Sequence, residues 1–349
     1  MLFRSAPLWR QLATIAIGLV GGLIFLAIGV PAGAMSGAMA ACAIVGTFAP
    51  QWVVPMNSFL RYFAMVASGV SIGATVTGET FRNIAAYPFS VSGMVVCVLV
   101  MSFFSVMVSL KISRWDRPTA VLAAVPGAMA FVLAAVMTTG ANAPRVVTVQ
   151  MMRVFFLVCL VPLVLAETGA QVISPAVRAS DSWGMFAIEA AIGCGVGLLF
   201  TRWKVVGGMF LGAMAVSGLF HAFEFAVGRA PLPVLIIGQV MIGTWTGQRF
   251  AGFDWSHFLR EAPAMVGAIA VTVLISAGFA WVASGALGLP FGATFLAYSP
   301  GGMEAMTVMA MALGIDPFFI AAHHLARFVL LHVGLPLSLN WLVGQKPKA

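Results

Sequence analysis

Long apolar runs with almost no charge are the feature that most limits how this chain can fold. Residues 12–30 carry no charged side chain, and several further windows of about 18 or more residues are nearly uncharged. Such a run matches the roughly 20 apolar residues that an α-helix needs to cross a bilayer. Only 8% of the 349 residues are charged, against about 25% in soluble domains. We therefore expect an all-α, polytopic membrane protein.

The charged residues and the cysteines limit the partners that this chain can have. The net charge of +8 fits loops that face an anionic membrane surface. No basic cluster exceeds KISRWDR (111–117), so we do not expect nucleic acid as a partner. The four cysteines lie inside apolar segments without a C-x-x-C pair, so we interpret them as small hydrophobic residues. We expect no disulfide framework, metal site or other cofactor.

The chain contains an internal duplication. VPGAMAFVLAAVMTTGAN (125–142) aligns with SPGGMEAMTVMAMALGID (299–316) at a spacing of 174 residues, and the same spacing pairs Arg153 with Arg327. GAMSGAMA (33–40) aligns with GMFLGAMA (208–215) at a spacing of 175. A shared Pro-Gly and arginine in fixed register predict two related membrane repeats, residues 1–174 and 175–349. The polar stretch 167–183 between them resembles a linker.

Each half contains six hydrophobic segments. In the first half they are 12–30, 31–50, 58–77, 89–111, 118–140 and 146–166, and in the second 183–201, 205–222, 231–249, 262–284, 290–313 and 317–342. If all twelve cross the membrane, the two halves are parallel. If one segment in each half enters and returns on the same side, five cross and the second half is inverted.

The distribution of Lys and Arg distinguishes the two topologies, because cytoplasmic loops carry an excess of both. We place the N-terminus, with Arg4 and Arg10, inside in each case. Twelve crossings put ten loop cations inside and six outside, namely Arg82, Arg145, Arg202, Lys204, Arg249 and Arg260. With both Pro-Gly segments re-entrant, thirteen lie inside and only Arg82, Arg178 and Arg229 outside. The second count favours inverted repeats with both termini in the cytoplasm.

The two Pro-Gly motifs predict broken helices at membrane depth. Pro126 and Pro300 each remove a backbone donor, and the glycines that follow (Gly127, Gly301 and Gly302) weaken helix formation. Irregular backbone in a membrane occurs where it is buried in protein or lines a watery cavity. Paired broken helices in inverted repeats are typical of secondary transporters, in which the half-helix ends face substrate and ions. We therefore expect these five residues to belong to a substrate site.

Charged side chains inside apolar segments are the other candidates for function. Arg153 and Arg327 each have a polar residue three positions earlier, Gln150 and His324, on the same helix face. We expect these four residues to bind an anionic substrate; snorkelling to the interface or pairing with Glu304 are the alternatives for the arginines. Glu304 occurs only in the second copy, and we expect it to bind a proton or Na⁺, or to pair with an arginine.

Glu189 is a further acidic residue within a predicted span. It is either a proton carrier, and hence a second candidate for ion coupling, or a partner in helix packing. The G-x-x-x-G patterns in 33–37 and 208–212 predict close helix approach rather than a ligand site.

The duplicated AVPGAM (124–129) and YSPGGMEAM (298–306) motifs resemble those of the bacterial AbrB-type membrane proteins, which also carry an internal duplication. The resemblance covers both halves. Members of that family are commonly labelled as ammonia monooxygenases or as AbrB family regulators, and the resemblance supplies no catalytic residues.

Neither label follows from the residues. A copper monooxygenase needs clustered histidine or carboxylate ligands, and the five histidines have no H-E-x-x-H or comparable spacing. Direct regulation of transcription needs a soluble DNA-binding module, for which no interval between the spans is long enough. We therefore expect no enzyme activity; an influence on gene expression would be indirect.

The sequence thus predicts a secondary transporter of the bacterial inner membrane. The solute is expected to be a small, carboxylate-like anion that binds between the two Pro-Gly breaks. No G-x-x-x-x-G-K-[ST] motif is present, so H⁺ or Na⁺ would drive transport. The alternative is a membrane sensor that binds a ligand without moving it. The expected partners besides the solute and the ion are the lipid bilayer and, as an alternative to a monomer, further copies of the same chain in a homo-oligomer.

Overall fold

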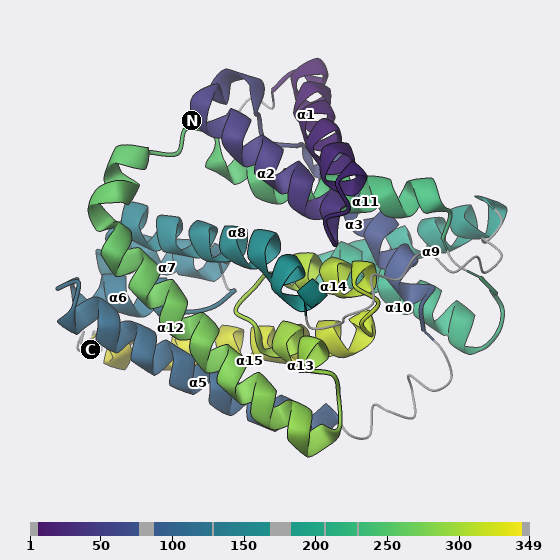
Figure 1. Ribbon diagram of the computed structural model, residues 1–349. Coiled ribbons are helices and arrows are strands. Elements are labelled where there is room, and N and C mark those ends of the chain that lie inside the picture. Colours follow the sequence, from purple (N-terminus) through teal and green to yellow (C-terminus); the bar gives the residue numbers. More distant parts are fainter. Residues whose placement is uncertain are drawn as a thin grey trace. The chain divides into compact units, whose positions relative to one another are not determined.

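The computed structural model describes residues 6–76, 87–127, 129–167, 183–205, 207–228 and 230–343. Within these ranges the regular elements are helices (Figure 1). The first half contains α1 (Leu8–Ala27), α2 (Gly33–Phe48), η1 (Pro50–Trp52), α3 (Ser58–Gly73), α5 (Tyr87–Lys111), α6 (Arg117–Ala124), α7 (Met129–Thr139) and α8 (Ala143–Glu167). The second contains α9 (Trp183–Arg202), α10 (Gly208–Ala222), α11 (Leu232–Gly247), η3 (Gln248–Phe250), α12 (Trp255–Leu287), α13 (Phe291–Tyr298), α14 (Met303–Ala312) and α15 (Pro317–Val343).

Six of the described helices are long and apolar enough to cross a membrane: α1, α5, α8, α9, α12 and α15. Their outward side chains are apolar as well; on α1, Val20, Leu23 and Ile24 are each more than half exposed. Such a surface suits a lipid environment and not water. This is the architecture of a polytopic, all-α membrane protein, as the composition predicts.

The predicted broken helices are present in both copies. The segment 118–140 divides into α6 and α7, and the segment 290–313 divides into α13 and α14. The breaks fall at residues 125–127 and 299–302, where the Pro-Gly motifs lie. Residues 168–182 of the predicted linker (167–183) are outside the described residues, as are the cations Arg82, Arg178 and Arg229. The count of crossings and the inverted topology therefore stay predictions.

The helices form two compact units. In the first, α1, α2 and α11 pack together, and α9, α10 and α3 form an equivalent group. The third helix of each half thus packs on the first two helices of the other half. In the second unit, α12 packs against α5 and α13, and α5 packs against α6. The proposed halves 1–174 and 175–349 are a different partition, since each unit takes helices from both.

The elements of the two halves recur at a nearly constant spacing. The starts of α6, α7, α8 and α3 are each 174 residues before the starts of α13, α14, α15 and α11, and α1 and α2 start 175 residues before α9 and α10. Ala32 before α2 and Gly207 before α10 both have left-handed backbone, with φ of 53° and 64°. The repeat therefore extends from the sequence to individual backbone angles.

Glycines bring the first two helices of each half into backbone contact. A Cβ atom added to Gly37 of α2 would lie 2.2 Å from the carbonyl oxygen of Gly21 in α1. One added to Gly212 of α10 would lie 2.5 Å from the amide nitrogen of Gly197 in α9. Real Cβ atoms do not approach that closely, so these four positions require glycine. The predicted packing role of the two G-x-x-x-G patterns is confirmed.

Candidate functional site

The first Pro-Gly break leaves backbone carbonyls of α6 without helical partners. α6 ends at Ala124, Val125 has extended backbone, and Gly127 has a φ of +88°. Because Pro126 has no N–H and the chain turns away at Gly127, the last carbonyls of α6 need donors from elsewhere. Side chains of α8 supply them.

Gln150 and Arg153 of α8 bind these carbonyls. The Gln150 amide donates to Leu122 O at 3.3 Å and to Val125 O at 2.7 Å. The Arg153 guanidinium donates to Val125 O at 3.2 Å and to Gln150 Oε1 at 2.5 Å. Both side chains are buried. The predicted pair on one helix face thus lies at the end of α6, beside the break.

The second break has the same arrangement. α13 ends at Tyr298, and residues 299–302 separate it from α14. Arg327 of α15 donates to Ser299 O and to Gly301 O, each at 2.5 Å, and to His324 Nδ1 at 2.9 Å. Since His324 Nδ1 accepts, Nε2 carries the hydrogen and donates to Leu296 O at 3.0 Å. His324 is therefore in the neutral state here.

The bonds at the two breaks correspond residue by residue. Adding 174 to the positions of Leu122, Val125, Gln150 and Arg153 gives Leu296, Ser299, His324 and Arg327, and each equivalent donor reaches the equivalent carbonyl. The positive charge of an arginine at the carboxyl end of a short helix also interacts favourably with the negative end of the helix dipole. The arrangement therefore has a local structural reason in both copies.

The two guanidinium groups lie close to one another within the second unit. A Cβ atom added to Gly127 would lie 3.2 Å from Arg327 Nη2, so Arg327 contacts both breaks. Arg153 and Arg327 interact electrostatically, as like charges. Among the described residues, neither arginine forms an ion pair with a carboxylate, and buried Arg153 Nε has no hydrogen-bond partner there. The site therefore combines two buried cations with unused donor capacity.

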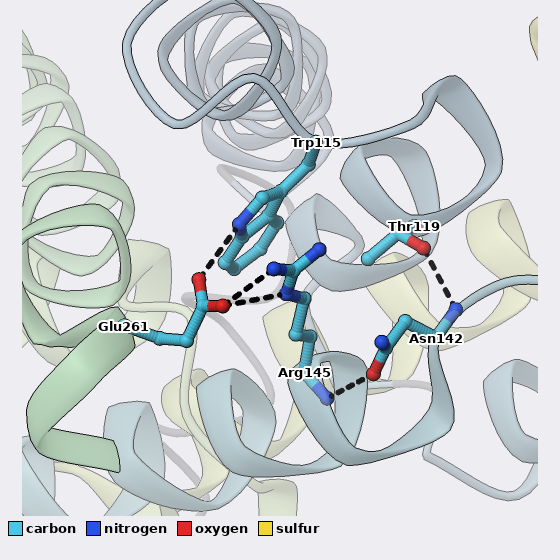
Figure 2. A network of polar contacts seen from close by, with 5 residues as sticks. All are labelled: Trp115, Thr119, Asn142, Arg145 and Glu261. Carbon is cyan, nitrogen blue, oxygen red and sulfur yellow. Dashed lines mark hydrogen bonds and ion pairs between the residues drawn. The ribbon is translucent and has the colours of Figure 1, made fainter. Parts of the chain in front are cut away.

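Polar contacts join the two ends of the first broken segment (Figure 2). The Asn142 backbone N–H, which follows α7, donates to Thr119 Oγ1 in the first turn of α6 at 2.7 Å. The chain therefore leaves the segment beside the point where it entered. α6 and α7 form a hairpin, as the re-entrant prediction requires.

An ion pair fixes this hairpin base to α12. Arg145 binds Glu261 Oε1 at 2.5 Å, and Trp115 Nε1 donates to Glu261 Oε2 at 3.1 Å. The guanidinium also lies 5.4 Å from the centre of the Trp115 ring. Figure 2 shows Glu261 facing both partners. We refer to Trp115, Arg145 and Glu261 as the hairpin clamp.

Sequence reasoning missed a second polar group in this unit. Tyr298 at the end of α13 donates to the Ser90 carbonyl at 2.8 Å, and His323 Nε2 lies 2.8 Å from Ser90 Oγ. His323 Nδ1 donates to Phe319 O, so Nε2 accepts from the Ser90 hydroxyl. These contacts attach α13 and α15 to α5. A sequence signal for His323 was its position four residues before Arg327, which places it near the same helix face.

The acidic candidates lie in the first unit. Glu304, in the first turn of α14, is half-buried and interacts electrostatically with Arg249. Glu189 of α9 is fully buried against Ser217 and His221 of α10. The last two residues were not predicted, although their spacing of four places them on one helix face.

The comparisons with known proteins now bear on this geometry. Residues 34–343 match the family model described as "Transition state regulatory protein AbrB". The chain belongs to the AbrB family. It is 24% identical to "Uncharacterized protein YhjN" of Bacillus subtilis (strain 168), with 98% of this chain and 96% of the relative covered. It is 23% identical to "Putative regulator AbrB" of Escherichia coli (strain K12), with 97% and 98% covered. The family resemblance seen in the repeated motifs is confirmed.

Proposed function

We propose that this AbrB family member is a secondary transporter, not an enzyme, and that Arg153 and Arg327 bind a small anionic solute beside the two Pro-Gly breaks. The observation that carries the proposal is the excess of positive charge there. Two guanidiniums contribute about +2, whereas the carboxyl ends of α6 and α13 contribute about −0.5 each. About one positive charge is left over in a buried setting, where an unpaired charge is costly.

A carboxylate-like anion fits the donors. A guanidinium can hold a carboxylate through two parallel N–H groups, which gives geometric selectivity as well as affinity. The amides that start α7 follow the first break directly and add a partial positive charge. In this proposal Pro126, Gly127, Pro300, Gly301 and Gly302 shape the site, and Gln150 and His324 orient the arginines.

Glu304 is the proposed group for coupling to H⁺ or Na⁺. A carboxylate within a membrane protein is expensive unless it is paired or binds a cation. Its electrostatic partner, Arg249, lies just past the end of α11. Glu189 is the second candidate for the same role.

The expected location is the bacterial inner membrane with both termini in the cytoplasm. The excess of Lys and Arg on the predicted inner side supports this orientation. We propose no nucleic-acid partner. The proposed site lies within one chain, so it allows either a monomer or an assembly of identical subunits.

A membrane sensor is the second candidate function. The Escherichia coli relative named as a regulator favours it, because a protein that binds the same anion without moving it could affect gene expression indirectly.

Binding and flux can be measured separately. Thermal-shift titration of the purified protein with a panel of small mono- and dicarboxylates should reveal stabilising ligands, since a ligand that binds only the folded state raises the melting temperature. Arg327→Lys keeps the charge but loses the planar fork, so it should weaken that stabilisation at least tenfold in ligand concentration. Arg202→Lys, an exposed arginine at the end of α9, is the matched control and should leave it unchanged.

Flux is then measured in proteoliposomes with the ligand so identified. Uptake that responds to an imposed H⁺ or Na⁺ gradient supports a transporter, and Glu304→Gln should remove the dependence on the gradient. Binding without flux supports the sensor. If no carboxylate stabilises the wild-type protein, or if Arg327→Lys responds like the wild type, the proposed anion site is wrong.

A further inference from the structure

A buried polar cluster in the first unit lies apart from the residues proposed to bind the solute. It consists of Glu189 on α9 together with Ser217 and His221 on α10. The side chain of Glu189 is 0% exposed and that of His221 is 5% exposed. Ser217 is also fully buried. We call these three residues the α9–α10 cluster.

The hydrogen bonds of Ser217 constrain the protonation state of Glu189. Ser217 Oγ lies 3.0 Å from Val70 O and 3.1 Å from Glu189 Oε2. A hydroxyl has one hydrogen, so it cannot donate to a carbonyl and to an ionised carboxylate at once. If Oε2 carries a proton, it donates to Ser217 Oγ, and Ser217 donates to Val70 O. Every short contact of this hydroxyl is then a hydrogen bond.

His221 supports the same cluster from the next turn of α10. Its Nδ1 lies 2.9 Å from Ser217 O and 3.3 Å from Glu189 Oε1. Because a carbonyl can only accept, Nδ1 carries a hydrogen and points it between these two oxygens. The Nδ1–H group thus stabilises Glu189 when the carboxyl group is ionised and remains a hydrogen-bond donor to Oε1 when it is protonated. Both protonation states of Glu189 therefore have partners.

The first half shows that packing does not require ionisable groups at this place. The equivalent residues, 175 positions earlier, are Thr14, Cys42 and Gly46. Thr14 and Cys42 are also fully buried, and Cys42 Sγ lies 3.6 Å from Thr14 O. The same helix junction is therefore formed with neutral residues in one copy and with an acid and an imidazole in the other. A buried acid costs stability, so its presence in only one of the two copies indicates a function there.

Other titratable or charged residues on the surrounding helices lie further along them. Arg61 precedes Val70 by nine residues on α3, about 14 Å along the axis, and Arg202 follows Glu189 by thirteen on α9, about 20 Å. Glu224, just after α10, is exposed. The remaining titratable side chains of α3, α9 and α10 are Tyr62 and Cys194.

We propose that the α9–α10 cluster is a proton-binding site, in which Glu189 Oε2 takes up one proton. The protonated Oε2 then donates to Ser217 Oγ, and the Ser217 hydroxyl donates to Val70 O. Uptake converts the carboxylate to the neutral acid and lowers the negative charge of the cluster by one, with no other bond made or broken. Proton binding does not depend on the proposed solute. Only the use of the proton to drive transport rests on the proposed function.

Infrared difference spectroscopy tests the proposal without any solute. The full-length protein in lipid is compared at acid and alkaline pH, and the C=O stretch of a protonated carboxyl group is followed. We expect a component of this band that titrates with pH, is lost in Glu189→Gln and persists in Glu224→Gln, which changes an exposed acid just after α10. His221→Asn should shift the pH at which this band appears, because it changes the donor beside Oε1.

A second variant covers the case in which Glu189→Gln does not fold. The triple substitution Glu189→Thr, Ser217→Cys and His221→Gly copies the neutral residues of the first half. It should fold and should lack the titrating band. The proposal is overturned if the spectra of Glu189→Gln and of the triple variant titrate as the wild type does, or if no component of the band titrates in the wild type. Loss of the band together with unaltered, proton-independent solute flux would refute the coupling role alone.

Discussion

The bases of the two Pro-Gly segments have the same geometry and different chemistry. In the first copy, Arg145 pairs with Glu261. The equivalent residues 174 positions away are Phe319 and Tyr87, whose rings lie 5.3 Å apart at an interplanar angle of 80°. The start of the helix that follows one broken segment (α8 or α15) thus contacts the helix that precedes the other broken segment (α12 or α5). This contact recurs, although an ion pair in one copy is an aromatic pair in the other. At this place the fold requires contact and not a particular chemistry.

At the breaks themselves, in contrast, the chemistry is the same in both copies. There the same residue type, arginine, reaches equivalent carbonyls in both copies. Carbonyls left free by a proline can only be satisfied by donors, and a strong donor is needed where water is scarce. The comparison separates positions that any well-packed pair can fill from positions that need a specific group.

Removing an arginine at a break should have the largest effect. Arg327→Met loses two charge-assisted bonds to carbonyls, each worth about 1.5–3 kcal/mol, and Arg153→Met loses one. We therefore expect both variants to be destabilised and Arg327→Met to lose about twice as much. Melting temperatures of the purified variants in one detergent measure this. The hydrogen bonds indicate that Arg327 stabilises its break more than Arg153 does. Equal losses of stability in the two variants would contradict this.

A methyl group at the first break should have an intermediate effect. Gly127→Ala places a side chain at φ +88° and 3.2 Å from Arg327 Nη2, which should cost about 1–3 kcal/mol. Gly302→Ala is the matched control in the second break. No atom lies within 4 Å of its added Cβ, so its effect should stay within about 0.5 kcal/mol. Thermal unfolding of the two variants gives the answer, and a Gly127 variant as stable as the control would contradict the close approach of Arg327.

The hairpin clamp should contribute least and should respond to salt. The side chains of Arg145 and Glu261 are 27% and 20% exposed, so Glu261→Gln should cost about 1 kcal/mol or less, and the loss should shrink at high ionic strength. Phe319→Leu removes the equivalent aromatic contact, worth about 0.5–1.5 kcal/mol, with no such dependence. Melting curves at low and high salt test the contrast; parallel salt responses would show that the clamp is not electrostatic.

Much of this fold follows from the sequence, because helix length, polarity and breaks have local causes. The apolar runs predict the helices, and the Pro-Gly motifs predict where α6 and α13 end. The spacing of 174 predicts that Arg153 and Arg327 have equivalent surroundings. The constraint that a membrane places on every backbone donor and acceptor makes such predictions reliable.

Contacts between distant segments could not be predicted. Glu261 lies 116 residues from Arg145, and Ser217 lies 28 from Glu189. No periodicity connects such positions, since their proximity depends on how the helices pack. The interleaving of the halves, in which α3 packs on α9 and α10, is likewise set by tertiary packing. For the same reason the bonds of Arg153 and Arg327 to backbone carbonyls were not predicted; the sequence suggested only a substrate, Glu304 or the membrane interface as their surroundings.

The direct glycine contacts between α1 and α2, and between α9 and α10, limit how the molecule can change shape. Where the backbones touch through Gly21 and Gly37, or through Gly197 and Gly212, there is no room for either helix to shift against the other without a clash. Each of these helix pairs must therefore translate or tilt as a single stiff body. Hinges belong in the connections outside them, and a probe attached to both members of a pair would record a fixed separation throughout any working cycle.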